Sequence, residues 1–111
     1  MEITTNRYKH SDLVKVDGRV DSATAPRLAE TLNAVMDEGR YKLILDMSDV
    51  TFISSAGLRV LVNTQKVCRR YNRGEIVLTN VPANIYSALD LAGFTSLFKI
   101  FDDNLTAVGS F

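Results

Sequence analysis

Two adjacent serines are the residues of this sequence best placed to do chemistry. Ser54 and Ser55 follow the apolar step at residues 50–53 and precede Ala56 and Gly57, after which the apolar residues recur at helical spacing. Either serine can cap that helix by accepting a hydrogen bond from a free backbone N–H. A hydroxyl at a helix N-terminus, at the carboxyl end of a central strand, lies where open α/β sheets usually place their functional groups.

The other reactive residues of the sequence do not form the kind of catalytic group that enzymes use. His10, the lone histidine, falls in a predicted hairpin loop at residues 9–12 and is expected to be solvated. Cys68 falls on the apolar side of a predicted helix, where it packs as a small hydrophobe. No Cys/His cluster suits zinc, and the turn at residues 54–57 has one glycine and no following lysine, unlike a phosphate-binding loop. We therefore expect no metal, no cofactor and no catalytic residues.

Length and composition indicate one ordinary globular domain spanning residues 1–111. Of its residues, 46% are hydrophobic and 23% are charged, as in ordinary globular proteins. The 13 basic and 13 acidic residues give a net charge of zero, so the protein as a whole has no electrostatic attraction for nucleic acid or an anionic membrane. No apolar run approaches the roughly 20 residues of a membrane span, and the N-terminus lacks the apolar core of a signal peptide. The single cysteine suits a reducing compartment. We expect a cytoplasmic protein.

Five strands are predicted from short apolar runs, at residues 2–8, 13–20, 43–45, 76–78 and 98–101. The run at 43–45 has no alternation, as expected of a central strand covered on both faces. Asp46, Ser48 and Asp49 are expected to end it, because their side chains bond nearby backbone groups. The second strand alternates, with Val14, Val16 and Val20 on its apolar face, so it is expected to be half-buried. Gly18 falls on the same face and suggests a bulge.

Helical spacing of apolar residues predicts four helices between and after these strands. The residues expected to cap their N-termini are, in chain order, Thr24, Ser54 or Ser55, Asn80, and Asp102 or Asp103. Pro26 and Pro82 fall in the first turns of the first and third helices. The first three helices are expected to end at Gly39, Gly74 and Gly93. The order ββαβαβαβα predicts an α/β fold with a mostly parallel central sheet and an N-terminal hairpin at one edge.

The predicted second and third helices each have an apolar face. The inward residues are expected to be Leu58, Leu61, Val62 and Cys68 on the second helix and Ile85, Leu89 and Ala92 on the third. The opposite side of the second helix carries a mostly basic stripe of Arg59, Asn63, Lys66, Arg70 and Arg73. Such a stripe is usually a solvated face, although it could meet an acidic partner; RNA is disfavoured because no aromatic residues interleave with it.

Residues 46–58, D-M-S-D-V-T-F-I-S-S-A-G-L, resemble the signature of the STAS domain. That family is named for sulfate transporters and anti-sigma factor antagonists, and its bacterial form often reads D-[LF]-S-x-V-x-[FY]-[IM]-D-S-[SAT]-G-L. Residues 18–21 resemble its G-x-[LIV]-D motif, and residues 91–94 with 97–100 resemble its C-terminal pattern. The resemblance covers almost the entire chain in the right order.

The resemblance implies a phosphorylation site and a partner surface. In stand-alone family members an anti-sigma factor, a serine kinase of the ATPase/histidine-kinase-like fold, phosphorylates the serine that falls on Ser55. The usual acidic residue before it is Ser54 here, a departure that leaves Ser54 as the second choice of phosphoacceptor. Asp21 matches an aspartate near the partner-binding surface. The expected partner-binding residues are Asp21, Ser22, Ser54, Ser55, Ala56, Gly57 and Arg59.

The implied function is that of an anti-sigma factor antagonist. Unphosphorylated, the protein would bind an anti-sigma factor serine kinase and free a sigma factor; phosphorylation would end that binding and a serine phosphatase would restore it. ATP and Mg²⁺ would belong to the kinase, so the chain is a substrate and not an enzyme. Three alternatives stay open: a scaffold or regulator module of a stress-signalling complex, a small subunit of a lipid or anion transporter, and a domain that binds a nucleotide or small ligand beside the serines.

Overall fold

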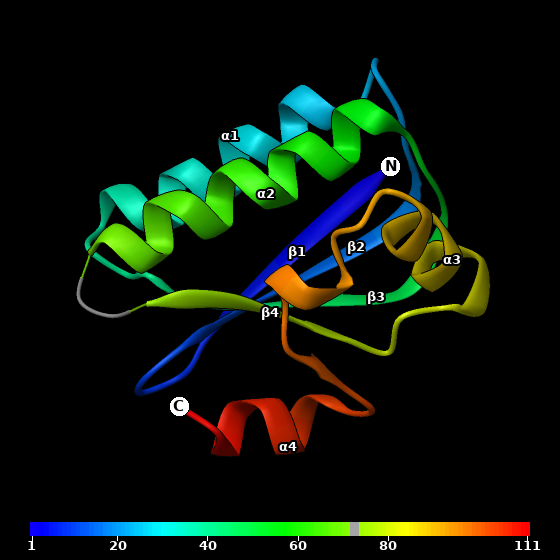
Figure 1. The fold of residues 1–111 in the computed structure, drawn as a ribbon. Helices are drawn as coiled ribbons and strands as arrows, with labels where there is room; N and C mark the ends of the chain where they lie inside the picture. Colours follow the sequence, from blue (N-terminus) through cyan, green and yellow to red (C-terminus); the bar gives the residue numbers. More distant parts are fainter. Residues whose placement is uncertain (72–73) are drawn as a thin grey trace.

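A five-stranded sheet in the order β1-β2-β3-β4-β5 forms the centre of the computed structural model, which describes residues 1–71 and 74–111. The strands are β1 (Glu2–Arg7), β2 (Asp12–Val20), β3 (Lys42–Ile53), β4 (Glu75–Thr79) and β5 (Ile100–Phe101). β1 pairs antiparallel with β2, and the other neighbouring strands are parallel. The mostly parallel sheet with a hairpin at its edge is therefore confirmed (Figure 1).

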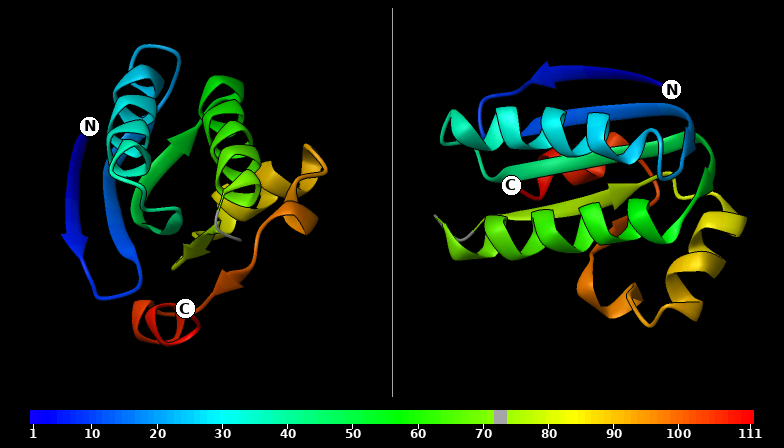
Figure 2. Two further views of the ribbon diagram at one scale, coloured as in Figure 1. Left: turned by 90° about the vertical axis from the view of Figure 1, so that its left-hand side faces the viewer. Right: turned by 90° about the horizontal axis from the view of Figure 1, so that it is seen from above.

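Within the described residues, four α-helices pack around this sheet: α1 (Ala25–Asp37), α2 (Ser55–Arg70), α3 (Ala83–Leu91) and α4 (Asn104–Gly109). Figures 1 and 2 show α1 and α2 side by side on one face and α4 on the other. α3 lies near the carboxyl end of β3 and is followed by a short 3-10 helix, η1 (Thr95–Leu97), that the sequence patterns did not predict. The element order otherwise agrees with the predicted ββαβαβαβα.

The core follows the predicted two-sided burial of β3. Leu43 and Leu45 are fully buried in the large cluster beneath α1 and α2, whereas Ile44 belongs to a second cluster beneath α4. Leu13 joins that second cluster, so the start of β2 is covered on both faces rather than half-buried as its alternation suggested. On the opposite side of β2 the valines pack inward as predicted.

Asp46, Ser48 and Asp49 do not end the central strand, so this prediction was wrong. β3 runs from Lys42 to Ile53 without a break. The buried Asp46 carboxylate accepts hydrogen bonds from the backbone N of Ser48 at 3.0 Å, Nδ2 of Asn80 at 3.2 Å and Nδ2 of Asn104 at 2.9 Å. Because two of these donors come from distant parts of the chain, Asn80 after β4 and Asn104 at the start of α4, Asp46 is satisfied while it stays within the strand.

These hydrogen bonds make Asp46 sensitive to acid. Burial acts to raise its pKa, but the bonds from Asn104, Ser48 and Asn80 outweigh burial and hold the pKa below the ordinary value of 3.8. A carboxyl whose pKa is lower in the folded than in the unfolded state stabilises the fold above the unfolded pKa. That contribution is lost as pH falls through the folded pKa.

We therefore expect Asp46→Asn to unfold more easily at neutral pH, by about 1–3 kcal/mol, because one of its amide donors loses a buried acceptor. Its unfolding free energy should also fall less steeply below the ordinary aspartate pKa. Urea titrations of both proteins from about pH 7 to about pH 3 measure both effects. An acid dependence identical to that of the wild type would show that Asp46 makes no such contribution.

The ends of several elements differ from the sequence prediction. α2 ends at Arg70, and Gly74 lies beyond it, where a Cβ would be 2.2 Å from the carbonyl oxygen of Tyr41, so its role is close backbone packing. Arg73, assigned to the basic stripe, lies outside the described residues. Ala92 is exposed rather than inward, because α3 ends at Leu91 and Ala92 is its C-cap. The last strand is shortened to Ile100–Phe101.

The predicted caps are partly correct. Asp103 caps α4 by accepting a hydrogen bond from the backbone N of Thr106 at 2.7 Å, and Gly39 and Gly93 follow α1 and α3 with φ of 80° and 75°. Asn80 does not cap α3, which begins after Pro82 without a side-chain cap. Asn80 has φ 53° and directs its amide to Asp46 instead. Gly18, with φ 108° at a register shift between β2 and β3, confirms the bulge.

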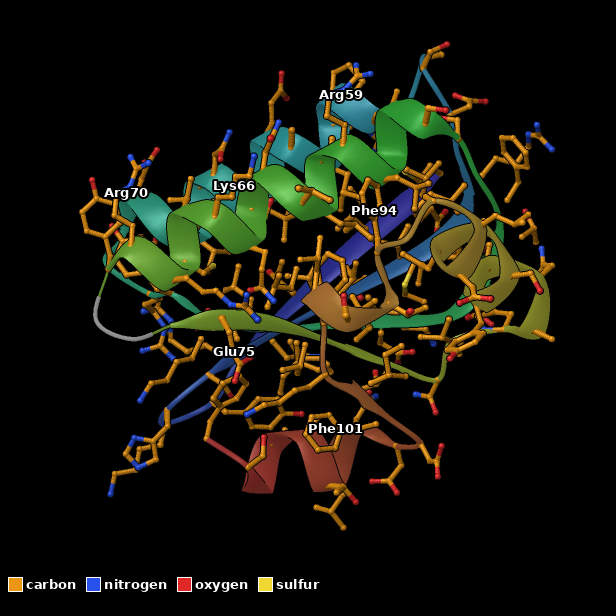
Figure 3. All side chains as sticks on the ribbon, viewed as in Figure 1. Arg59, Lys66, Arg70, Glu75, Phe94 and Phe101 are labelled. Carbon is orange, nitrogen blue, oxygen red and sulfur yellow. The ribbon has the colours of Figure 1, made fainter. Side chains whose placement is uncertain are left out.

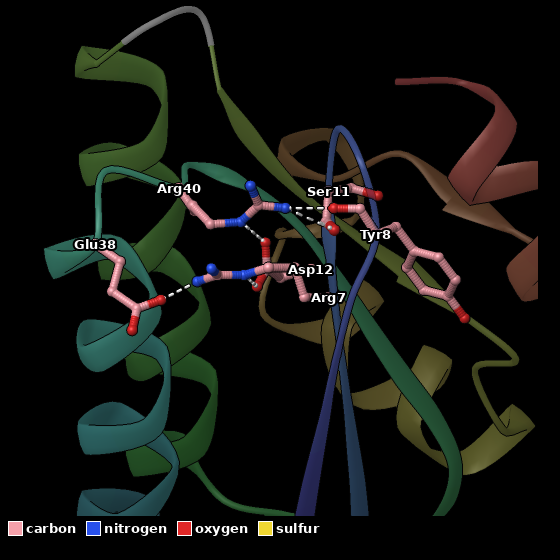
Figure 4. Close-up of polar contacts among 6 residues, drawn as sticks. All are labelled: Arg7, Tyr8, Ser11, Asp12, Glu38 and Arg40. Atoms are coloured by element: carbon pink, nitrogen blue, oxygen red, sulfur yellow. Dashed lines mark hydrogen bonds and ion pairs between the residues drawn. The ribbon is translucent and has the colours of Figure 1, made fainter.

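A partly buried ion pair fixes the edge hairpin to the rest of the domain (Figure 4). Asp12, assigned to the hairpin loop, is instead the buried first residue of β2. Its carboxylate contacts the guanidinium of Arg40 and lies 3.7 Å from Nε of Arg7. Arg40 also donates from Nη2 to the carbonyl oxygens of Tyr8 at 2.6 Å and Ser11 at 3.2 Å. Arg40 therefore compensates the buried charge and holds the turn of the hairpin.

Candidate functional site

The structure separates the roles of the two serines. Ser54 is the N-cap of α2: its Oγ accepts a hydrogen bond from the backbone N of Gly57 at 3.3 Å. Its own backbone N donates to the carbonyl oxygen of Val20 at 2.8 Å and so joins the ends of β3 and β2. Ser55 is the first residue of α2 and is exposed, and its hydroxyl has no hydrogen-bond partner within the described part of the chain. The cap is Ser54, and Ser55 presents the free hydroxyl.

Gly57 lets the first turn of α2 pack directly on the strand ends. A Cβ at this position would lie 2.8 Å from Cγ1 of Ile53, 2.8 Å from Cγ1 of Val20 and 3.2 Å from the carbonyl oxygen of Val20. Such contacts are closer than side chains normally tolerate. The turn at residues 54–57, named the serine turn below, is therefore fixed to β2 and β3, which gives Ser55 a defined position.

Asp21 organises the loop between β2 and α1. Its Oδ1 accepts hydrogen bonds from the backbone N of Ala23 at 3.0 Å and of Thr24 at 3.1 Å. These bonds hold the pKa of Asp21 below its usual value, and the bond from the backbone N of Thr24 has the largest effect. Thr24 precedes α1 as predicted, but its hydroxyl does not cap the helix; it donates to the carbonyl oxygen of Arg19 at 2.8 Å. The exposed Ser22 lies on the same loop.

An open groove of about 340 Å³ adjoins the serine turn. One wall is formed by residues of α2, including Ser55, Arg59 and Lys66, and the other by Ala92 and Phe94 of the segment after α3. Figure 3 shows Arg59, Lys66 and Arg70 distributed along α2, with Phe94 beside the helix. Val62, predicted to face the core, is half-buried in the α2 wall of this groove. No sequence signal pointed to Phe94 as part of this region.

The predicted partner-binding residues gather at one end of the domain. Ser54, Ser55, Ala56, Gly57 and Arg59 lie in the first turns of α2. The hydrogen bond between Ser54 and Val20 places the loop that carries Asp21 and Ser22 next to them. Figure 1 shows the end of β2 and the start of α2 at the same end of the sheet.

The lone histidine and cysteine lie away from this end. His10 is exposed in the turn between β1 and β2. Cys68 is fully buried, and burial together with Glu75 raises the pKa of its thiol to about 12, so almost no thiolate forms at neutral pH. Within residues 1–71 and 74–111, no group of three or more His, Cys, Asp or Glu residues is arranged to hold a metal ion. None of the helices in these ranges has the length and apolar character needed to cross a membrane.

The fold and the serine turn together define a STAS domain. The family model for the STAS domain matches residues 3–107, and the chain belongs to this family. The chain is 31% identical over 111 residues to BtrV of Bordetella bronchiseptica, a candidate anti-sigma factor antagonist, covering 100% of this chain and 95% of BtrV. It is 28% identical over 102 residues to an anti-sigma-B factor antagonist of Staphylococcus epidermidis, covering 90% and 94% of the two chains.

The same fold occurs in a solved structure. The crystal structure of a candidate anti-sigma factor antagonist from Thermotoga maritima matches this chain with a TM-score of 0.90. The two are 20% identical, and the match covers 97% of this chain and 92% of the other. The predicted STAS-like architecture is thereby confirmed.

Proposed function

We propose that this STAS domain is an anti-sigma factor antagonist controlled by phosphorylation of Ser55. Unphosphorylated, it binds an anti-sigma factor serine kinase and so frees a sigma factor; phosphorylated, it dissociates. The names of the relatives, which match over nearly their whole length, support the first part. The observation that carries the second is the division of roles in the serine turn, where Ser54 serves as the cap and the Ser55 hydroxyl is free.

The proposed transfer needs only a hydroxyl from this chain. The γ-phosphoryl group of ATP passes to Oγ of Ser55, ADP leaves, and the hydroxyl proton goes to a base of the kinase. Mg²⁺ and ATP are assigned to the kinase. The phosphate formed on Ser55 is favoured by the N-terminus of α2, because the backbone N–H groups of the first helical residues have no partners within the helix. A serine phosphatase completes the cycle by hydrolysing the ester with water, and all of these steps are proposed to take place in the cytoplasm.

Phosphopeptide mapping tests this proposal. The protein is incubated with ATP and each anti-sigma factor kinase of its own organism, and fragmentation mass spectra locate the phosphate. We expect one phosphate on Ser55, its loss in Ser55→Ala, and its retention in Ser54→Ala. Phosphate on Ser54 with Ser55 unmodified would overturn the site. Absence of both phosphate and kinase binding would overturn the function and favour a scaffold or transporter role.

We propose that the negative charge of Asp21 contributes to the interface with the anti-sigma factor. A test of this must separate the charge from the hydrogen bonds by which Asp21 organises its own loop. Asp21→Asn retains an oxygen that can accept the bonds from Ala23 and Thr24, so its unfolding free energy should stay close to that of the wild type. Its association rate with the anti-sigma factor should fall severalfold at low salt, as expected for a charge at the rim of an interface. Stopped-flow binding at two salt concentrations measures this effect.

Asp21→Ala serves as the structural control, because it removes the acceptor as well and should lower the unfolding free energy below that of Asp21→Asn. Unchanged association kinetics in Asp21→Asn would place Asp21 outside the interface.

A further inference from the structure

Arg59 is a cation without a partner in the turn of α2 that follows Ser55. It is exposed, and the structure of residues 1–71 and 74–111 gives it no hydrogen bond, ion pair or aromatic contact. Of the other arginines in these ranges, only Arg70 shares this property. The remaining ones each contact a carboxylate, a carbonyl oxygen or an aromatic ring: Arg7, Arg19, Arg27, Arg40 and Arg69.

The helix places Arg59 within reach of Ser55. Residues four positions apart on a helix are neighbours, with about 5–6 Å between their Cβ atoms. Helical side chains also lean toward the N-terminus, a direction that takes a side chain at position 59 toward the turn that begins at Ser55. Both residues line the same groove, which confirms that they share one face of α2.

The charges around the groove favour an anion at this position. The charged residues among those that line it are Arg59 and Lys66, and the wall facing α2 contributes the neutral Ala92 and Phe94. Asp21 is the carboxylate of the neighbouring β2–α1 loop, and its Oδ1 is already bonded to the loop backbone. A phosphate on Ser55 would therefore meet one nearby guanidinium and a second, more distant ammonium.

We propose that Arg59 captures the phosphate of phosphorylated Ser55 through an ion pair within α2. This inference rests on the proposed phosphorylation of Ser55 and names the residue that holds its product. A guanidinium binds two phosphate oxygens at once with its planar fork, which a lysine cannot do. Because the pair forms within one chain, it competes with the cations of the kinase for the new phosphate and so favours release of the partner.

The test uses the full chain with phosphoserine encoded at position 55, so no kinase is needed. The second pKa of the phosphate, about 6 for a free phosphoserine, is measured by ³¹P NMR titration. A partner cation lowers this pKa. We expect the pKa to be higher in Arg59→Gln than in the wild type by about half a unit or more, with a smaller difference in high salt.

Lys66→Gln is the matched control, because it removes the same charge from the same groove farther along α2. Its phosphate pKa should stay close to that of the wild type, and Arg59→Lys should give a value between those of the wild type and Arg59→Gln. Equal shifts in Arg59→Gln and Lys66→Gln, or no shift in either, would overturn the capture. Because the phosphoserine is encoded, a kinase that modifies Ser54 instead would overturn the proposed function without altering this measurement.

Discussion

Ser55→Asp is expected to keep the stability of the wild type and to lose affinity for the anti-sigma factor by on the order of a hundredfold or more. Ser55 is exposed in the first turn of α2, where a negative charge is favourable, so the fold should not loosen. In the complex, the same charge would meet a surface shaped for a neutral hydroxyl and the acidic groups that a kinase uses for catalysis. Calorimetric binding and urea unfolding measure the two properties separately.

Two further variants separate charge from loss of the hydroxyl. Ser55→Ala should bind the anti-sigma factor and accept no phosphate. Ser54→Ala should lose about 1 kcal/mol of stability, because Gly57 loses its capping acceptor, yet should still accept phosphate at Ser55. Wild-type affinity in Ser55→Asp would mean that the partner binds elsewhere on the domain.

The sequence predicted those parts of the fold that depend on neighbouring residues. An uninterrupted apolar run marked residues 43–45 as buried on both faces, and Gly18 marked a bulge, because each pattern reflects a local constraint. Asp46 was misread for the opposite reason. Its acceptor role depends on Asn80 and Asn104, which are 34 and 58 residues away, so a turn-forming residue became part of a long strand.

Gln65 shows the same limit on the apolar face of α2. Its position one turn after Leu61 faces inward, but a polar residue there gave no signal of burial. In the structure its amide donates to the carbonyl oxygens of Ile76 at 3.2 Å and Leu97 at 2.7 Å and accepts from the backbone N of Ile76 at 2.8 Å. These partners belong to β4 and η1, and η1 itself was not predicted.

The candidate site was located by sequence, but its internal roles were not. The helix start explained why one serine should cap, without deciding between Ser54 and Ser55. In the structure Ser54 is the cap because its Oγ accepts from the backbone N of Gly57, and the carbonyl oxygen of Val20, at the end of β2, holds the backbone of Ser54 in place. The groove beside Arg59 likewise requires Phe94, which approaches α2 only after the chain has passed through α3. The phosphorylation of Ser55 and the partner-binding roles stay predictions.

Leu61→Ala is expected to lower the free energy of unfolding by roughly 2–5 kcal/mol. Leu61 is fully buried on the inner face of α2, and α2 contacts the sheet and α1 along this face. Removing three of its carbon atoms leaves a cavity that close-packed neighbours fill only in part. Urea unfolding followed by circular dichroism measures the loss.

Val62→Ala is the matched control, because Val62 is the next residue of α2 but is only half-buried in the wall of the groove. Its loss should be smaller, about 1 kcal/mol. The serine turn is held by bonds from Ser54 to Val20 and Gly57, none of which involves Leu61. Leu61→Ala should therefore still accept phosphate at Ser55 at temperatures below its lowered melting point. Equal losses in the two variants would show that α2 packs through a different face.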